Sequence, residues 1–79
     1  MDTTVALLAE LRAAREMPSP EVARQIRLAA KLPQARMARA LGVNRSTLAR
    51  WEGGTMQPRV EKRALYAGLL AELQREIAS

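Results

Sequence analysis

The sequence predicts a single all-helical domain, and three features of composition and patterning support this class. The chain has 79 residues, enough for one compact domain and too few for two. Its apolar residues are mainly Ala (15) and Leu (11), with six Val and Ile together and no Phe, a mixture that favours helices over strands. Apolar residues also recur at helical spacing between the prolines and glycines. We therefore expect one compact all-α domain over residues 1–79.

The N-terminal helix is expected over residues 4–16. Val5, Leu8 and Leu11 recur every three residues in this segment, and Leu7 widens the apolar stripe. The prolines in residues 17–20 end the helix, because proline disrupts a helix interior.

The next helix is expected over residues 20–31. Ser19 is a good N-cap, Pro20 suits the first helical position, and Glu21 complements the helix dipole in the first turn. Spacing places Val22, Ile26, Ala29 and Ala30 on one apolar face, and it places Arg24, Arg27 and Lys31 on another.

Two short helices are expected over residues 34–41 and 45–52. Pro33 precedes the first, and Gly42 after it suits the left-handed conformation at a helix end. Asn44 is the N-cap of the second helix. Two short helices joined by a three-residue turn that begins with glycine are the sequence outline of a helix-turn-helix.

A long C-terminal helix is expected over residues 60–77, the longest element of the chain. Its apolar stripe recurs every four residues, at Leu65, Leu69, Leu73 and Ile77. Gly68 within it predicts a kink or a close helix contact.

The charge distribution indicates an anion-binding middle segment. Residues 18–59 carry eight Lys and Arg against two Glu, whereas the flanking segments are close to neutral, for a net charge of +5.

There is no Cys and no His, which excludes Cys/His metal sites, thiol nucleophiles and the usual general base near neutral pH. We therefore expect no catalytic residues, no metal and no cofactor. No apolar run is long enough to span a membrane, so a cytoplasmic protein associated with the nucleoid is expected.

Residues 34–53, QARMARALGVNRSTLARWEG, resemble the helix-turn-helix of the Cro/Xre-type family of phage-repressor-like DNA-binding proteins. The family's small and glycine positions are filled by Ala38 and Gly42. Its apolar positions are filled by Met37, Leu41, Val43, Leu48 and Trp51. The sequence WEGG followed by Pro58 also resembles the family's ending. The resemblance covers about residues 21–60 and implies a compact five-helix, lambda-repressor-like fold. The helix at 4–16 is an addition, and one long helix at 60–77 replaces the two short ones common in the family.

The resemblance implies that the helix at 45–52 contacts bases in the major groove. The base-contacting candidates are Arg45, Ser46, Arg50 and Asn44. Arginine forms two parallel bonds to guanine, so Arg45 and Arg50 predict G·C pairs in the site. The candidates for phosphate contacts are Gln34, Thr47, Thr55, Gln57 and Arg59, and Arg36 and Arg39 are candidates to extend the basic surface.

Three further expectations concern structure and assembly. In the family, residues at the positions of Arg27 and Glu52 form an ion pair that braces the first helix against the recognition helix. The spacing of Trp51 with Leu48 places it in the core rather than on a stacking surface. We expect a homodimer formed through the helix at 60–77, with or without the helix at 4–16, on a pseudo-palindromic double-stranded DNA operator.

The function expected from these observations is a sequence-specific transcriptional regulator, a small repressor of the phage, plasmid or antitoxin type. Two alternatives stay open: a protein-interaction adaptor on the same scaffold, and a DNA-bending accessory factor for recombination. A largely apolar exposed side on the helix at 45–52 would favour the adaptor. An additional protein partner, such as a toxin, is not identifiable from the sequence.

Overall fold

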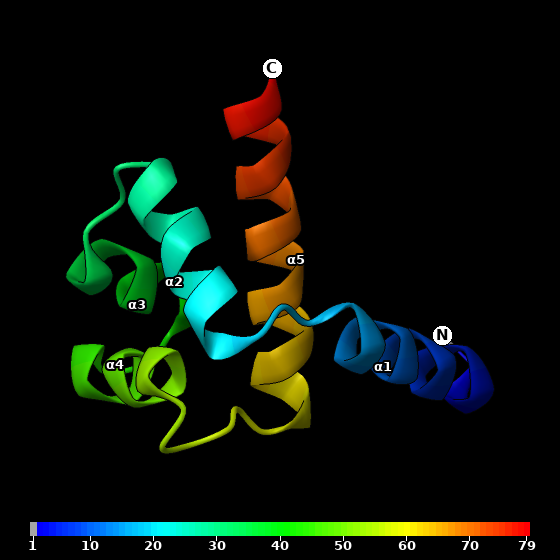
Figure 1. Cartoon of the computed structure of the whole chain (residues 1–79). Coiled ribbons are helices and arrows are strands. Elements are labelled where there is room, and N and C mark those ends of the chain that lie inside the picture. Colours follow the sequence, from blue (N-terminus) through cyan, green and yellow to red (C-terminus); the bar gives the residue numbers. More distant parts are fainter. Residues whose placement is uncertain (1) are drawn as a thin grey trace.

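The computed structural model is built from five helices in the order that the sequence predicts (Figure 1). It describes residues 2–79, and the side chains of residues 9, 10 and 12–16 lie outside this description. The helices are α1 (Thr3–Glu16), α2 (Pro20–Ala29), α3 (Gln34–Leu41), α4 (Arg45–Gly53) and α5 (Val60–Ala78). The described residues contain no strand, so the expected all-α class is confirmed. None of these helices combines the length and the apolar composition that crossing a membrane requires.

The helix starts differ in how far side chains cap them. The Ser19 hydroxyl accepts a hydrogen bond from the Val22 backbone N–H at 3.3 Å, as the sequence predicts. Asn44 occupies the N-cap position of α4 without a capping bond from its side chain. Pro33 at the N-cap of α3 also provides no side-chain cap, because its ring has no hydrogen-bonding group.

Helix α2 ends at Ala29, two residues before the expected end at Lys31. Lys31 adopts the left-handed conformation, with φ of +56°, and two backbone bonds of a Schellman motif close the helix. They run from the Lys31 N–H to the Leu28 carbonyl (2.9 Å) and from the Leu32 N–H to the Arg27 carbonyl (3.2 Å). No glycine marks this helix end, because the left-handed residue is a lysine.

Replacing Lys31 by glycine is expected to stabilise the fold by about 0.5–1 kcal/mol. A side chain in the left-handed conformation costs about 1–2 kcal/mol, and the greater freedom of glycine in the unfolded chain offsets part of the gain. Urea unfolding followed by circular dichroism measures the change. The matched control is Ala30→Gly, which should destabilise, because Ala30 has ordinary helical angles (φ −79°, ψ −2°). A loss of stability in Lys31→Gly would contradict the argument.

The core lies where α2, α3 and α4 meet the first half of α5. Its largest fully buried side chains are Tyr66, Met37, Leu41, Leu48 and Leu70. Trp51 is 4% exposed, as expected for a core residue, and its ring lies 5.2 Å from that of Tyr66. On α2, the buried apolar residues are Ala23 and Ile26, whereas Val22 and Ala29 are exposed. The predicted apolar face of α2 is therefore rotated, because Arg27 takes an inward position beside them.

Helix α5 uses much of its apolar stripe inside its own domain. Leu70 is buried, and Leu69 and Leu73 pack against the core, so that only the ends of the stripe, Leu65 and Ile77, are large exposed residues. The helix is continuous through Gly68. Within the described part of the chain, no atom lies within 4 Å of a Cβ built at Gly68. The kink or close contact expected at Gly68 is therefore not observed.

The Tyr66 hydroxyl is buried without a hydrogen-bond partner among the described residues. Its burial, with a smaller contribution from Glu52, raises the pKa of Tyr66 from 10.0 to about 12. The unfolded chain therefore ionises at lower pH than the folded one. The contribution of the Tyr66 pKa shift to the free energy of unfolding is therefore complete below pH 10, and it is lost as the pH rises toward 12.

Tyr66→Phe is expected to be more stable at pH 7 by about 1 kcal/mol, because an unpartnered buried hydroxyl is removed. It should also lose less stability than the wild type between pH 10 and 12. Urea unfolding at pH 7 and pH 11 tests both points. Equal pH dependence of the two proteins would show that the Tyr66 hydroxyl does not ionise differently on folding.

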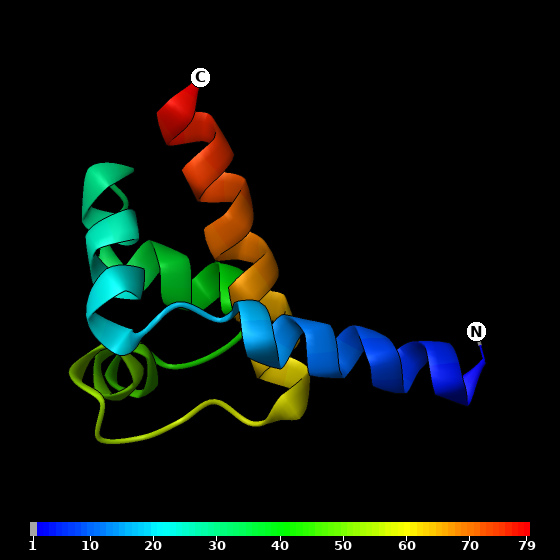
Figure 2. The same ribbon diagram turned by 45° about the vertical axis from the view of Figure 1, so that its right-hand side comes forward.

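Helix α1 leaves the body of the molecule. Its C-terminal end lies beside α5, and its N-terminal part projects away from the other helices (Figures 1 and 2). Four large apolar side chains on it, Val5, Leu7, Leu8 and Leu11, are 51–53% exposed. Packing of α1 on α5 within one chain thus leaves a broad apolar face uncovered.

Candidate nucleic-acid interface

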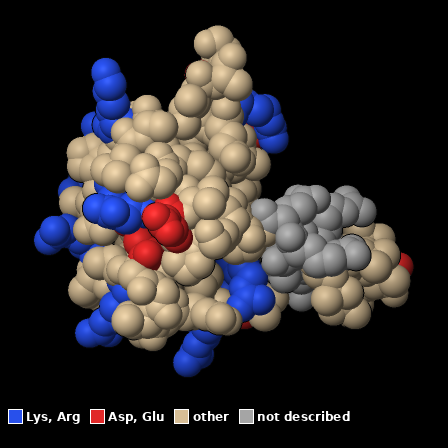
Figure 3. Space-filling model, viewed as in Figure 1, with Lys and Arg blue, Asp and Glu red and all other residues tan. Residues whose placement is uncertain are grey.

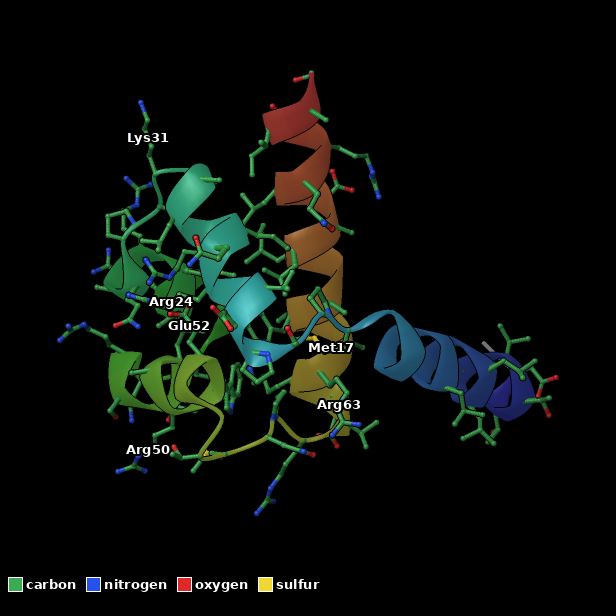
Figure 4. All side chains as sticks on the ribbon, in the orientation of Figure 1. Met17, Arg24, Lys31, Arg50, Glu52 and Arg63 are labelled. Atoms are coloured by element: carbon green, nitrogen blue, oxygen red, sulfur yellow. The ribbon has the colours of Figure 1, made fainter. Side chains whose placement is uncertain are left out.

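The second short helix, α4, is buried along one side and polar along the other. Leu48, Trp51 and Glu52 face the core. The exposed residues of the helix are Arg45, Ser46, Ala49, Arg50 and Gly53, and none of them is a large apolar residue. Arg50 extends away from the body (Figure 4). Asn44 is exposed immediately before the helix, so the four base-contacting candidates lie together on the free side and at the start of α4.

The start of α3 provides backbone donors beside this helix. The first two N–H groups of a helix have no acceptor within it, and no side chain caps those of Gln34 and Ala35. The positive end of the helix dipole adds to this, so the site favours an anion. The Gln34 side chain is directed inward, where its Nε2 donates to Glu52 Oε1 at 3.0 Å. A phosphate at α3 would meet these backbone N–H groups and the second N–H of the Gln34 amide, whose first N–H is held by Glu52.

The other candidates for phosphate contacts lie on or beside the loop between α4 and α5. Thr47, Gln57 and Arg59 line one surface hollow, which Val43, Trp51, Met56, Glu61 and Lys62 complete. Thr55 lies outside this hollow, and its hydroxyl donates to the Arg50 carbonyl at 3.4 Å, at the end of α4. The structure therefore brings together three of the four remaining candidates and gives Thr55 a position at the helix end.

A buried ion pair fixes the orientation of α4. Arg27 Nε donates to Glu52 Oε2 at 2.7 Å, and Arg27 Nη2 donates to Glu52 Oε1 at 3.0 Å. The two side chains are 8% and 2% exposed. Arg27 Nη1 also donates to the Leu32 carbonyl at 3.0 Å. The pair implied by the family resemblance is therefore formed here with two-point geometry, and Gln34 is its third member.

Basic side chains gather around the end of the molecule formed by α2, α3 and α4. In Figure 3 they line that edge of the body, and others lie below it near the loop that follows α4. Arg24, Arg36 and Arg39 are exposed on α2 and α3. Arg24 extends from α2, and Lys31 extends from the turn that follows α2 (Figure 4). This end of the molecule is therefore positively charged around the exposed side of α4.

Lys62 is a contributor that the sequence did not indicate. Its Nζ donates to the Leu41 carbonyl at 2.8 Å and lies 3.0 Å from a Cβ built at Gly42. A cation at this carbonyl is favourable, because the C-terminal end of a helix carries partial negative charge. The contact joins α5 to the turn between α3 and α4, and only the packing of α5 across that turn brings Lys62 there.

This arrangement defines a helix-turn-helix DNA-binding fold, with a polar recognition helix held against its partner helix. A family model described as Helix-turn-helix, of the Cro/C1 type, matches residues 24–70, more than half of the chain. The chain therefore belongs to this family of DNA-binding regulators, and the predicted resemblance is confirmed. No curated protein and no solved structure matches the chain.

Proposed function

We propose that this protein is a sequence-specific double-stranded DNA-binding transcriptional regulator, acting in the cytoplasm as a small dimeric repressor on a pseudo-palindromic operator. In this proposal α4 lies in the major groove, where Arg45, Ser46, Arg50 and Asn44 contact bases. Backbone N–H groups of α3, with Gln34, Thr47, Thr55, Gln57 and Arg59, contact the phosphates.

The observation that carries the proposal is the composition of the exposed side of α4. The exposed residues of this helix are Arg45, Ser46 and Arg50, together with the small residues Ala49 and Gly53. A surface that docks on protein normally has a more apolar centre, so this helix supports DNA over the adaptor alternative. No particular contact in the described residues favours the DNA-bending role.

The dimer of this proposal is placed differently from the sequence-based expectation. The helix at 60–77, with or without the helix at 4–16, was expected to supply the interface, yet the core of its own domain uses Leu69, Leu70 and Leu73. Four large apolar residues that stay exposed lie within seven positions of α1, whereas the three on α5, Val60, Leu65 and Ile77, are far apart along the helix. We therefore propose that α1 contributes the main part of the interface, leaving the surface around α4 free for DNA.

Fluorescence anisotropy on the DNA upstream of the protein's own gene, and on a shuffled duplex of equal composition, tests the function. A repressor of its own gene should bind the native fragment about a thousandfold more tightly than the shuffled one. The slope of log affinity against log salt should fall by about 0.9 for each phosphate neutralised. Equal weak binding to both fragments would contradict self-regulation, and no binding near physiological salt would favour the adaptor.

Arg59→Ala is expected to weaken binding to every sequence by a similar factor and to reduce the salt slope by about 1. Its exposed side chain lies in the hollow beside α4, where it contacts a phosphate in this proposal. Anisotropy on the selected and shuffled duplexes measures both quantities. Arg75→Ala is the matched control, because Arg75 is exposed near the far end of α5.

Gln34→Ala should show the same uniform loss, provided that its helical circular dichroism is unchanged. That check is needed because the Gln34 amide also donates to the buried Glu52. A loss confined to particular base pairs, in either variant, would refute the phosphate role.

A further inference from the structure

The apolar face of α1 is a surface feature that the proposed DNA contacts do not use. Val5, Leu7, Leu8 and Leu11 are each about half exposed, on the part of α1 that extends from the body (Figure 2). Single exposed leucines are ordinary, but a contiguous row on a projecting helix indicates an interaction site. A partner is therefore expected to cover this row.

The spacing of these residues is self-complementary. Val5 and Leu11 lie three residues on either side of Leu8. If two copies of the helix pair antiparallel about a twofold axis at Leu8, Leu8 meets Leu8 of the partner subunit, and Val5 meets the partner's Leu11. A twofold contact requires one surface to be complementary to itself in this way. No other chain is needed to cover the row.

The charges of the segment favour the same arrangement. Antiparallel helices place the positive end of each dipole beside the negative end of the other. In this register, position 2 lies opposite position 14, which the sequence flanks with Arg12 and Arg15. The exposed Asp2 at the N-terminal end of α1 thus faces residues 12–16 of the other copy, which carry two Arg and one Glu, whereas a parallel pair would place Asp2 beside the partner's Asp2.

The placement of α1 is compatible with DNA binding by both copies. The helix projects from the side of α5 that lies away from α3 and α4 (Figures 1 and 2). With the axis at Leu8, the two attachment points at residue 16 are about 24 Å apart along the paired helices, from the rise of 1.5 Å per residue. This register therefore places the two attachment points at opposite ends of the paired segment.

We propose that α1 is a dimerisation helix, which pairs antiparallel with α1 of a second copy of this chain about an axis at Leu8. The inference extends the dimer of the proposed function, and its test is made without DNA. The second copy is preferred to a foreign partner because both the apolar spacing and the charges match the helix to itself.

Sedimentation velocity of the full chain over a concentration series tests the association. The wild type should be dimeric, and Leu8→Glu should raise the dimer dissociation constant by about 100-fold or more, since two carboxylates would meet at the axis. Leu28→Glu is the matched control, because Leu28 on α2 is also exposed (44%), and it should leave the constant unchanged. A wild type that stays monomeric at binding concentrations, or equal effects of the two substitutions, would overturn the proposal.

Single-cysteine variants locate the axis, because the chain has no cysteine of its own. Under mild oxidation with diamide, Leu8→Cys should form a disulfide-linked dimer readily, because a disulfide needs Cα atoms within about 7 Å. Ile77→Cys, at the exposed end of α5, should not. An equimolar mixture of Val5→Cys and Leu11→Cys should link more than either variant alone. Preferential linkage through Ile77→Cys would place the interface on α5 and overturn the assignment to α1.

The two proposals fail separately. A dimer linked at position 8 that does not bind DNA would refute the function and leave the dimerisation helix intact. Specific DNA binding by a protein that stays monomeric at those concentrations would refute the dimerisation helix alone.

Discussion

Glu52→Ala is expected to lower the free energy of unfolding by about 3–5 kcal/mol, the largest single effect predicted for this chain. The substitution leaves the Arg27 guanidinium, whose side chain is 8% exposed, as an uncompensated charge in a buried site. It also removes the acceptor of the Gln34 amide. Since a small domain has only about 5–15 kcal/mol of stability, much of the protein is expected to unfold at moderate temperature. Urea unfolding monitored by circular dichroism measures the loss.

Glu72→Ala is the matched control for this prediction. Glu72 accepts a hydrogen bond from Arg75 at 2.6 Å, similar in length to the buried pair, but the two side chains are 64% and 68% exposed. An exposed pair of this kind contributes about 0–1 kcal/mol. Comparable losses in the two variants would show that burial does not set the value of the Arg27–Glu52 pair.

The double variant Arg27→Met, Glu52→Leu separates the cost of an unpaired charge from the value of the pair. Replacing both charges by apolar side chains removes the buried charge and should restore part of the stability lost in Glu52→Ala. Restoration is expected to be incomplete, because Gln34 and the Leu32 carbonyl each lose a hydrogen-bond partner. If the double variant is no more stable than Glu52→Ala, the unpaired charge is not the main cause of the loss.

Arg45→Ala and Arg50→Ala are each expected to reduce discrimination at one base pair by about 1–3 kcal/mol, which corresponds to roughly 5- to 150-fold in affinity. Both side chains are exposed on α4 and contribute nothing to the buried core, so helical circular dichroism should be unchanged. Binding to a panel of duplexes, each substituted at one operator position, identifies the base pair at which each variant becomes indifferent.

Arg75→Ala serves as the control in this series as well, since it removes an exposed arginine far along α5 from α4. It should leave the preference for every base unchanged. Wild-type specificity in both Arg45→Ala and Arg50→Ala would mean that α4 does not contact the bases, and the proposed function would then lose its main support.

Local signals in the sequence located all five helices, with boundaries that differ from the structure by no more than two residues. Proline at 18, 20 and 33 and glycine at 42 and 54 act on the backbone itself, so their effect does not depend on the rest of the fold. The end of α2 was misplaced because a Schellman motif at Lys31 has no such residue. The exposed polar side of α4 was also predicted correctly, since helical periodicity alone separates it from Leu48 and Trp51.

Contacts between distant segments decided the remaining features. Spacing within α2 placed Arg27 on a basic face, and only the approach of Glu52 from α4 makes its burial favourable. The inward turn of the Gln34 amide and the contact from Lys62 to the Leu41 carbonyl likewise require helices to meet.

The apolar stripe of α5 has the same periodicity in the sequence whether the core of its own domain or another chain covers it. Tertiary packing assigned most of that stripe to the core and left the exposed row on α1. By itself the sequence determined the helices, their order and the family motif, because backbone preference and periodicity are local. Three-dimensional packing decided which polar groups are buried and which apolar face stays exposed, because burial depends on neighbours that are distant in the chain.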